Sequence, residues 1–412
     1  MLSAFFESPA RIHELGDGPA GACFESFAHE LSRGGYAEIT ARRHIRAAEH
    51  FIYWAERKGL RVRRLSEQSL EGFERHLGRC RCPRYGHSDR VHMVHSADLF
   101  LRHLRRAGVV PADAVKPSVQ DPALLTAFCQ WMRQQRGTAD RTLRHYVSPI
   151  RRLLRRLGEQ PSRFDARSLR EFVLEASRQC GWATAKKCTT ALRMFLRFLI
   201  TDGQCAAGLE GAIPVLAHWR LASLPRYLQG EEVERVIASC DLASPVGRRD
   251  HAILLLLARL GLRAGDIVQL RLGDVDWKGA AIHVCGKGRR QTRLPLTHEV
   301  GQAVAAYVQD GRPRANTEAV FVRGRAPFRA FASHCAVSVI VDRALHRAGV
   351  TRPSRGAAHL LRHSLATSLL RQGASLHEIA GILRHRSIET TQIYAKVDVP
   401  ALRQMAQPWP EV

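Results

Sequence analysis

Apolar residues recur at helical spacing along almost the whole chain, and the hydrophobic period changes to that of strands in one stretch. In Thr40 to Gly59, TARRHIRAAEHFIYWAERKG, the apolar positions follow one helical face and Gly59 supplies a stop. Between Asp276 and Thr297, two β-prone apolar runs flank the basic, glycine-rich sequence GKGRR, which indicates a hairpin. We therefore predict a mainly α fold with a small antiparallel β-sheet in the C-terminal domain, preceded by all-α N-terminal domains.

Three segments recur in the same order within the first half of the chain, which suggests a duplicated helical unit. The matched pairs are Thr40 to Gly59 with Thr142 to Gly158, Leu65 to Leu77 with Phe164 to Ala176, and Phe100 to Gly108 with Phe195 to Gly203. The alternative is that any two helical domains align loosely. In the second copy Pro149 is expected to kink its helix or split it.

The domain boundaries follow from these repeats and from a segment rich in Pro and Gly. We place an N-terminal helical domain at 1–112, with its repeated part starting near 22, and a second helical domain at 118–208. The segment 209–226 is interpreted as a linker. The C-terminal domain, 227–412, begins with the helices GEEVERVIASC and RRDHAILLLLARLG.

The charge of the chain points to a polyanionic partner. Sixty-three Lys and Arg against 38 Asp and Glu leave a formal charge of +25, and neutralising phosphates releases their condensed counterions. Nucleic acid is the leading candidate. A membrane surface is the competing one, but the basic residues are spread along the chain and no uninterrupted apolar run is long enough to span a bilayer. We expect a cytoplasmic protein that joins the bacterial nucleoid when bound to DNA.

The ten Cys sit at irregular spacings, so most are expected to be small buried hydrophobes and not a disulfide framework. One cluster is worth weighing as a metal site. Its spacing, C-x-C with scattered His, fits no standard zinc module, so a basic loop between helices is the favoured interpretation and no metal site is predicted. The cluster comprises Cys80, Cys82, His87, His92 and His95.

Four short segments of the C-terminal domain carry residues suited to phosphodiester chemistry: ARLGLRAGDIVQLRLGDVDW, GKGRRQTRLPL, HLLRHSLATSLL and LRHRSIETTQIYAKV. Each alone is weak, but their joint order is specific, and together they resemble the tyrosine recombinase, or phage integrase, family. The resemblance covers about 225–400, and 118–208 more loosely matches the family's core-binding domain. It places the catalytic residues at Arg263, Lys287, His359, Arg362, His385 and Tyr394.

Two positions depart from the family pattern. Asp266 stands where many members carry Glu, and it keeps the carboxylate that can orient neighbouring groups. Arg384 replaces the Gly that often precedes the late His, and it adds a cation near the nucleophile.

The residue types suit the chemistry that the resemblance implies. Arg263 and Arg362 can offer planar, permanently charged donors to the oxygens of a pentavalent phosphate. Tyr394 needs a base or a cationic pocket to lose its proton, and we assign His359 as that base. The resemblance implies a 3′-phosphotyrosine intermediate, with Lys287 as the acid for the departing 5′-hydroxyl and His385 as a donor to the phosphate.

No cofactor is expected for this reaction. The sequence shows no carboxylate cluster of the two-metal kind and no G-x-x-x-x-G-K-[ST] loop for ATP. The covalent bond would store the energy for rejoining.

Basic residues on the N-terminal helices are candidates for tracking the phosphates of double-stranded DNA, the alternative being a solvated helix face. They are Arg42, Arg43, Arg46, Arg141, Arg144, Lys186, Lys187 and Arg193.

The resemblance also implies four protomers of this chain holding two DNA sites, with accessory recombinases as further candidate partners. It implies that the tail after Tyr394 docks on a neighbouring protomer, through Val399, Leu402, Met405 and Trp409. Transposition, phage integration and chromosome or plasmid resolution all remain open as the task, with the duplicated helical domain favouring a mobile element.

Two rival functions are compatible with parts of this pattern. A type IB topoisomerase shares the tyrosine nucleophile but relaxes DNA without a partner site, and the box around His385 and the tandem helical domains favour the recombinase. A non-enzymatic regulator derived from an integrase would have lost catalytic residues, and all six are present.

Overall fold

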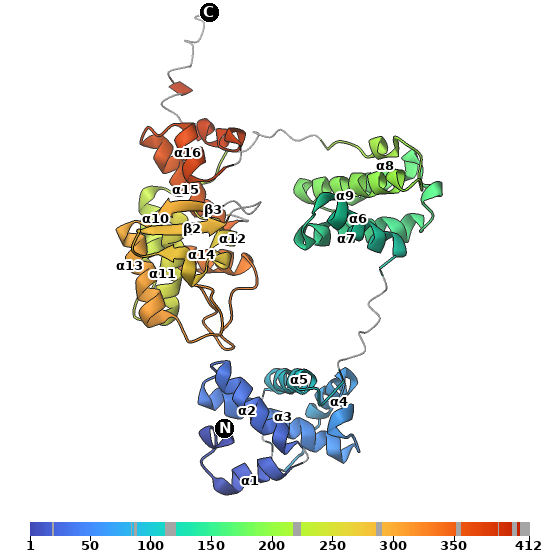
Figure 1. Cartoon of the computed structure of the whole chain (residues 1–412), viewed down its shortest axis with the longest axis vertical. Coiled ribbons are helices and arrows are strands. Elements are labelled where there is room, and N and C mark those ends of the chain that lie inside the picture. The colour runs from blue at the N-terminus through green and yellow to red at the C-terminus, as the bar shows by residue number, and fades with distance from the viewer. Residues whose placement is uncertain are drawn as a thin grey trace, which may run out of the picture. The chain divides into compact units, whose positions relative to one another are not determined.

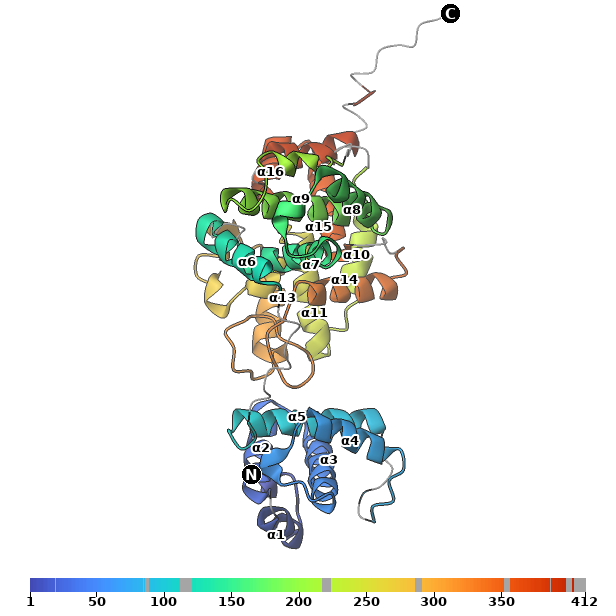
Figure 2. The same cartoon turned by 90° about the vertical axis from the view of Figure 1, so that its right-hand side faces the viewer.

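The structure is a computed structural model that describes residues 1–18, 20–83, 85, 89–111, 121–216, 224–285, 291–351, 356–385, 387–397 and 402–403. Its contacts divide the chain into two compact units (Figures 1 and 2). One unit contains Met1–Pro111 together with Leu221–Val412, and the other contains Ala112–Arg220. In the part of the chain that is described, no helix is long and apolar enough to cross a membrane.

The first hundred residues form a helical bundle around aromatic side chains. Phe27, Phe51, Phe73 and Phe100 are fully buried in its core, and such rings contribute much of the apolar area that a small bundle can remove from water. The serine Ser66 caps one helix by accepting a hydrogen bond from the backbone N–H of Ser69. The helices are α1 (Pro9–Asp17), α2 (Gly21–Arg33), α3 (Glu38–Arg57), α4 (Glu67–Leu77) and α5 (Arg90–Arg106), with short turns η1 (Leu2–Ala4) and η2 (Val62–Arg64).

The second unit is a separate helical bundle with its own core, in which Phe128 and Phe195 pack edge to face at 5.5 Å. Its helices are α6 (Ala123–Arg136), α7 (Asp140–Leu157), α8 (Ala166–Arg178) and α9 (Trp182–Thr201), with turns η3 (Pro161–Arg163) and η4 (Leu209–Ala212). Pro149 lies inside the continuous helix α7, so of the two predicted outcomes, a kink or a split, the split is wrong. Ile150, Leu153 and Leu154 bury the same face beyond it, and this packing offsets the cost of the missing backbone N–H.

The two bundles use the same packing scheme. In the first, α3 packs on α5, α4 on α5 and α2 on α3; in the second, α7 packs on α9, α8 on α9 and α6 on α7. The predicted helices that suggested a duplication therefore occupy corresponding places in two bundles of four helices, α2–α5 and α6–α9.

The C-terminal part, from residue 224 onward, packs around helix α11 (Pro245–Ala258), whose apolar second half, from Ala252 to Leu257, is fully buried. The other elements are α10 (Gly230–Ala238), α12 (Ala264–Gln269), η5 (Leu272–Asp274), α13 (His298–Ala306), η6 (Tyr307–Gly311), α14 (Cys335–Arg347), α15 (Ala357–Arg371), α16 (Leu376–Ile382), η7 (Ile388–Thr390) and η8 (Gln392–Val397).

The predicted hairpin is present as two antiparallel strands, β2 (Ala281–Cys285) and β3 (Gln291–Pro295), with Val284 opposite Thr292. The short β1 (Val275–Asp276) pairs with β2, so the sheet of the described residues has the order β1-β2-β3. The predicted fold class, mainly α with a small antiparallel sheet in the C-terminal domain, is confirmed.

Candidate active site

Two arginines far apart in sequence meet at one backbone carbonyl. Arg263 caps the N-terminus of α12 and donates from Nη2 to the carbonyls of Leu383 at 3.4 Å and Arg384 at 3.0 Å. Arg362, buried on α15, also donates to the carbonyl of Leu383, and its other terminal nitrogen donates to the carbonyl of Gly261. The turn that follows α16 thus fixes both guanidinium groups at one place. Figure 1 shows α15 and α16 side by side in the red part of the chain.

Gly261 permits this close approach. It adopts a φ of +58°, and a Cβ atom on it would lie 2.8 Å from the side chain of Leu383 and 3.0 Å from that of Leu365. A larger residue would therefore meet both backbone strain and a clash. The glycine that ends the predicted helix also lets α11 turn tightly enough to present Arg263.

The two departures from the family pattern are partners in the structure. Asp266 accepts hydrogen bonds from the backbone N–H of Arg263 at 2.9 Å and from Nη2 of Arg384 at 2.7 Å. Both side chains of the Asp266–Arg384 pair are only 8% exposed. Arg384 has a φ of +52°, a left-handed conformation that glycine adopts without cost and other residues rarely adopt. The ion pair compensates for this strain.

Tyr394, the predicted nucleophile, is buried in η8 and its hydroxyl lies 2.8 Å from Nδ1 of His363. Burial raises the pKa of Tyr394 to about 12, against the opposing effect of Arg362. Burial also lowers the pKa of His363 to about 4, followed by the effects of His359 and Arg362. Both shifts oppose transfer of the phenolic proton to His363 and favour a protonated Tyr394 hydroxyl.

His363 is the residue that sequence reasoning missed. It directly follows Arg362 in HLLRHS, and His359 lies one helical turn before it on the same face of α15, with the two rings 6.4 Å apart. His359, the predicted base, is exposed. The helical spacing could have placed His363 beside the predicted base, because residues four apart in a helix share a face, but it does not indicate a contact with Tyr394.

Of the two remaining predicted catalytic residues, the structure describes His385 but not Lys287. His385 follows α16 and its Nδ1 lies 2.8 Å from Oγ1 of Thr391, a fully buried residue. Burial, followed by Arg362 and Arg263, lowers the pKa of His385 to about 4. Lys287, the predicted acid at the hairpin tip, lies outside the described residues.

The cluster is a place where positive charge is crowded. Burial, followed by the charges of Arg263 and Arg384, lowers the pKa of Arg362 to about 9. Burial also lowers the pKa of Arg263, and the neighbouring Arg384 acts in the same direction while Asp266 opposes it. One carboxylate thus stands among three guanidinium groups. An anion placed here would relieve their mutual repulsion and accept their hydrogen bonds.

The predicted DNA-contacting residues differ in their availability. Those with exposed side chains are Arg43, Arg46, Arg141, Arg144, Lys186 and Lys187. Arg42 is instead engaged by Glu38 and by the backbone carbonyl of Phe5. Arg193 donates to the carbonyl of Ile213 at 2.9 Å and so fastens η4 to α9. Arg42 and Arg193 would have to break these hydrogen bonds in order to contact a DNA phosphate.

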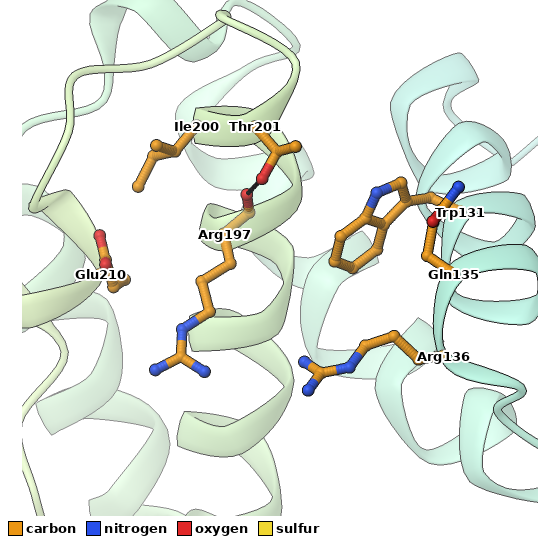
Figure 3. Close-up of a pocket in the computed structure, with 7 residues that line it drawn as sticks. All are labelled: Trp131, Gln135, Arg136, Arg197, Ile200, Thr201 and Glu210. Atoms are coloured by element: carbon orange, nitrogen blue, oxygen red, sulfur yellow. Dashed lines mark hydrogen bonds between the residues drawn. The ribbon is translucent and has the colours of Figure 1, made fainter.

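The second unit also contains an open hollow of about 520 Å³ between α6, α9 and η4, shown in Figure 3. Figure 3 shows the side chain of Arg136 extending toward Arg197 below the indole of Trp131, with Glu210 on the far side of Arg197. An indole beside two guanidinium groups is suited to contacting nucleic acid, but Glu210 counters part of the charge. The hollow contains none of the groups expected to perform catalysis.

In this mixed α and β domain, two arginines, two histidines and a tyrosine from distant segments meet around the turn after α16, an arrangement suited to an enzyme that binds the phosphate of a phosphodiester. The sequence matches the phage integrase family over residues 226–400 and the phage integrase, N-terminal SAM-like domain over residues 125–203. The chain belongs to the tyrosine recombinase, or phage integrase, family, whose members are enzymes that break and rejoin DNA in site-specific recombination.

Two related proteins and one solved structure agree with this assignment. The chain is 36% identical to the integrase/recombinase y4rA of Sinorhizobium fredii over 405 residues, which cover 96% of this chain and 95% of the relative. It is 30% identical to the tyrosine recombinase XerC of Pelotomaculum thermopropionicum over 68% of this chain and 94% of that protein. The fold resembles the crystal structure of the XerH recombinase bound to its palindromic difH substrate, with a TM-score of 0.53 and 20% identity over 70% of this chain and 85% of that chain.

Proposed function

We propose that this recombinase cleaves one DNA strand at a time through a covalent 3′-phosphotyrosine at Tyr394, on behalf of a mobile genetic element. The observation that carries the covalent step is the convergence of Arg263 and Arg362 on the carbonyl of Leu383, in the domain where the hydroxyl of Tyr394 is held by His363. The positive charge of these arginines is only partly balanced by the carboxylate of Asp266. A scissile phosphate supplies the missing anion.

The reaction follows from the roles of the groups. The oxygen of Tyr394 attacks the phosphorus, a new O–P bond forms, and the bond from phosphorus to the 5′-oxygen breaks. His359 takes the phenolic proton and Lys287 gives a proton to the departing 5′-oxygen. Arg263 and Arg362 bind the phosphate oxygens, where charge grows in the pentavalent transition state. A 5′-hydroxyl from the partner strand reverses these steps and completes the exchange.

His385 and His363 support this chemistry in different ways. With Nδ1 of His385 beside Thr391, Nε2 is the ring nitrogen that donates to the phosphate. His363 holds Tyr394 protonated until DNA is bound. Release of the hydroxyl from His363 and entry of the phosphate anion then bring the tyrosine into reach of His359.

We further propose that the chain consists of three domains joined by a linker: 1–112, 118–208 and 227–412, with the linker at 209–226. The separate hydrophobic cores support these limits, and the shared packing scheme of α2–α5 and α6–α9 supports a duplication of the core-binding domain. Two helical domains with exposed basic residues would extend the DNA footprint beyond that of a two-domain recombinase. The relative y4rA matches over 96% of this chain and 95% of its own length, which supports an arrangement common to both proteins.

Assembly on DNA is part of the proposal. Four protomers hold two double-stranded sites, and the tail after Tyr394 docks on a neighbouring protomer. Of the tail residues predicted to pack there, Leu402 is described and 49% exposed, while Val399, Met405 and Trp409 lie outside the described residues.

The test is a covalent adduct with DNA taken from the borders of the gene. A nicked duplex that loses its 5′-hydroxyl fragment on cleavage should trap the protein on the 3′ strand, and peptide mapping should locate the adduct on Tyr394. Tyr394→Phe should bind the same DNA and form no adduct. Tyr227→Phe is the matched control, because Tyr227 is in the same domain and its hydroxyl accepts from Arg371 instead.

Other outcomes would separate the rivals. If Tyr394→Phe still cleaved the DNA, the assignment of the nucleophile would be wrong. Relaxation of supercoiled DNA that lacks any border sequence, without strand exchange, would identify a topoisomerase. Binding without an adduct in the unaltered protein would support a regulator. Inverted repeats in the bordering DNA and joint molecules between two such sites would support the mobile-element role.

A further inference from the structure

Four side chains with metal-binding atoms meet in the N-terminal bundle, away from the catalytic residues in sequence. His50 comes from α3, His76 from the last turn of α4, and Cys80 and Cys82 from the segment that follows α4. Their ligand atoms all lie within 4.8 Å of one another. Three separate segments are needed to form this group, so the packing of α3 against α4 creates it.

Two sulfur–nitrogen separations match those of a tetrahedral site. Sγ of Cys80 lies 3.5 Å from Nε2 of His50, and Sγ of Cys82 lies 3.4 Å from Nε2 of His76. With zinc–sulfur bonds of about 2.3 Å and zinc–nitrogen bonds of about 2.0 to 2.1 Å, sulfur and nitrogen ligands at tetrahedral angles lie about 3.5 Å apart. Thiol-to-imidazole hydrogen bonds would explain each pair alone, but they do not require the two pairs to converge.

The surroundings favour a closed, structural site. The ring of Tyr85 stacks on His50 at 4.2 Å and Phe73 meets the same ring edge-on at 5.2 Å, so the imidazole is held in one orientation. His50 is 1% exposed. The backbone N–H of Cys82 donates to Sγ of Cys80 at 3.4 Å, a bond that stabilises a thiolate. The apolar rings restrict access for water.

The two sulfur and two nitrogen donors indicate which metal ion would bind. Two thiolates and two neutral imidazoles bind a divalent ion with no net charge left over, which makes burial against α3 inexpensive. This set suits zinc, a borderline-soft ion that accepts tetrahedral N and S ligands, better than magnesium or calcium, which prefer oxygen. Four protein ligands leave no open position for substrate.

We propose that His50, His76, Cys80 and Cys82 bind one structural zinc ion, which fastens the segment after α4 onto α3. Of the described residues that were weighed as a cluster from the sequence, Cys80 and Cys82 belong to this group of four. His92 and His95 lie against His44 instead, with ring separations of 5.2 Å and 6.1 Å, and His87 lies outside the described residues. The two histidines of the proposed site come from helices that the C-x-C spacing gives no reason to join.

The test begins with the metal content of the full-length protein purified from zinc-supplemented cells. We expect about one zinc per chain, released by a thiol-specific reagent with two thiols modified for each zinc. Replacement by Co²⁺ should give the absorption bands of tetrahedral cobalt with sulfur ligands. Cys80→Ser should lose most of the zinc, while Cys23→Ser, which changes a free cysteine of the same bundle, should keep it.

A ligand swap keeps the proposal testable if Cys80→Ser does not fold. Cys82→His retains a zinc ligand, so it should fold and hold zinc with a weaker cobalt–sulfur band. In the unaltered protein, a strong chelator should increase hydrogen exchange in α3 and α4 and leave α6–α9 unchanged. Unaltered protein without zinc that also gives no tetrahedral cobalt spectrum would overturn the proposal. So would full zinc content in Cys80→Ser.

Discussion

The pair formed by Asp266 and Arg384 offers a sharp test of how this active site is held together. Each side chain is 8% exposed, and Nη2 of Arg384 lies 2.7 Å from the Asp266 carboxylate. In Asp266→Ala the Arg384 guanidinium stays buried without its anion, beside the charges of Arg263 and Arg362. Removing one partner of a buried pair costs about 3–5 kcal/mol.

The loss of stability in Asp266→Ala should be partly reversed when the buried Arg384 guanidinium is removed as well. Arg384→Gly relieves a left-handed backbone at φ +52°, worth about 1 kcal/mol for a non-glycine residue. The double variant Asp266→Ala/Arg384→Gly should therefore be more stable than Asp266→Ala alone, with a coupling of about 2 kcal/mol or more.

Hydrogen exchange of the full-length protein measures these changes in stability separately for each segment. Peptides from α15 and α16 should exchange roughly 100- to 5000-fold faster in Asp266→Ala, and much less so in the double variant. The matched control is Glu234→Ala. Glu234 pairs with Arg259 but is 59% exposed, so its loss should cost below about 1 kcal/mol. If Asp266→Ala behaved like Glu234→Ala, or if the two single changes simply added, the buried pair would not be what fixes the turn.

Three further outcomes are expected. Burial lowers the pKa of His363 to about 4, below the unfolded value of about 6.5, so the unfolded chain binds the proton more tightly and stability falls as the pH drops from about 6.5 towards 4. His363→Gln should flatten the acid side of the melting temperature against pH, and an unchanged acid side would contradict this. Arg362→Lys should slow single-turnover cleavage by about 100- to 1000-fold with DNA binding retained, because Lys lacks the planar fork; a near-normal rate would remove Arg362 from the site. Arg144→Ala should weaken DNA binding and lower its salt slope by about 1, while Arg193→Ala should leave the slope unchanged and destabilise its domain by about 1 kcal/mol by losing the bond to Ile213. Equal slopes in both variants would refute that distinction.

Local patterns were sufficient for the secondary structure. The segment Thr40 to Gly59 is α3 to within two residues at each end, and the runs around GKGRR are β2 and β3. Helical periodicity and turn residues act over a few positions, so they can be interpreted from the sequence directly. Pro149 is the exception, because the tertiary packing of α7 outweighed a local rule.

The candidate catalytic residues could be chosen as a set from the sequence, since four short motifs in order are rare by chance, but their mutual contacts could not be predicted. Nothing in the spacing indicates that His363 holds the Tyr394 hydroxyl, or that Asp266 and Arg384, separated by more than a hundred positions, form one ion pair. The left-handed backbone at Arg384 likewise becomes visible only in three dimensions.

The sequence by itself determined the helices, the hairpin, the strong positive charge and the residue types that can cleave a phosphodiester. Only the tertiary structure decided which side chains meet. It placed two arginines on the carbonyl of Leu383 and brought His50 and His76 to Cys80 and Cys82. The physical reason is that a periodic pattern records which face of an element is buried, while the partner across that face is chosen by the packing of the whole domain.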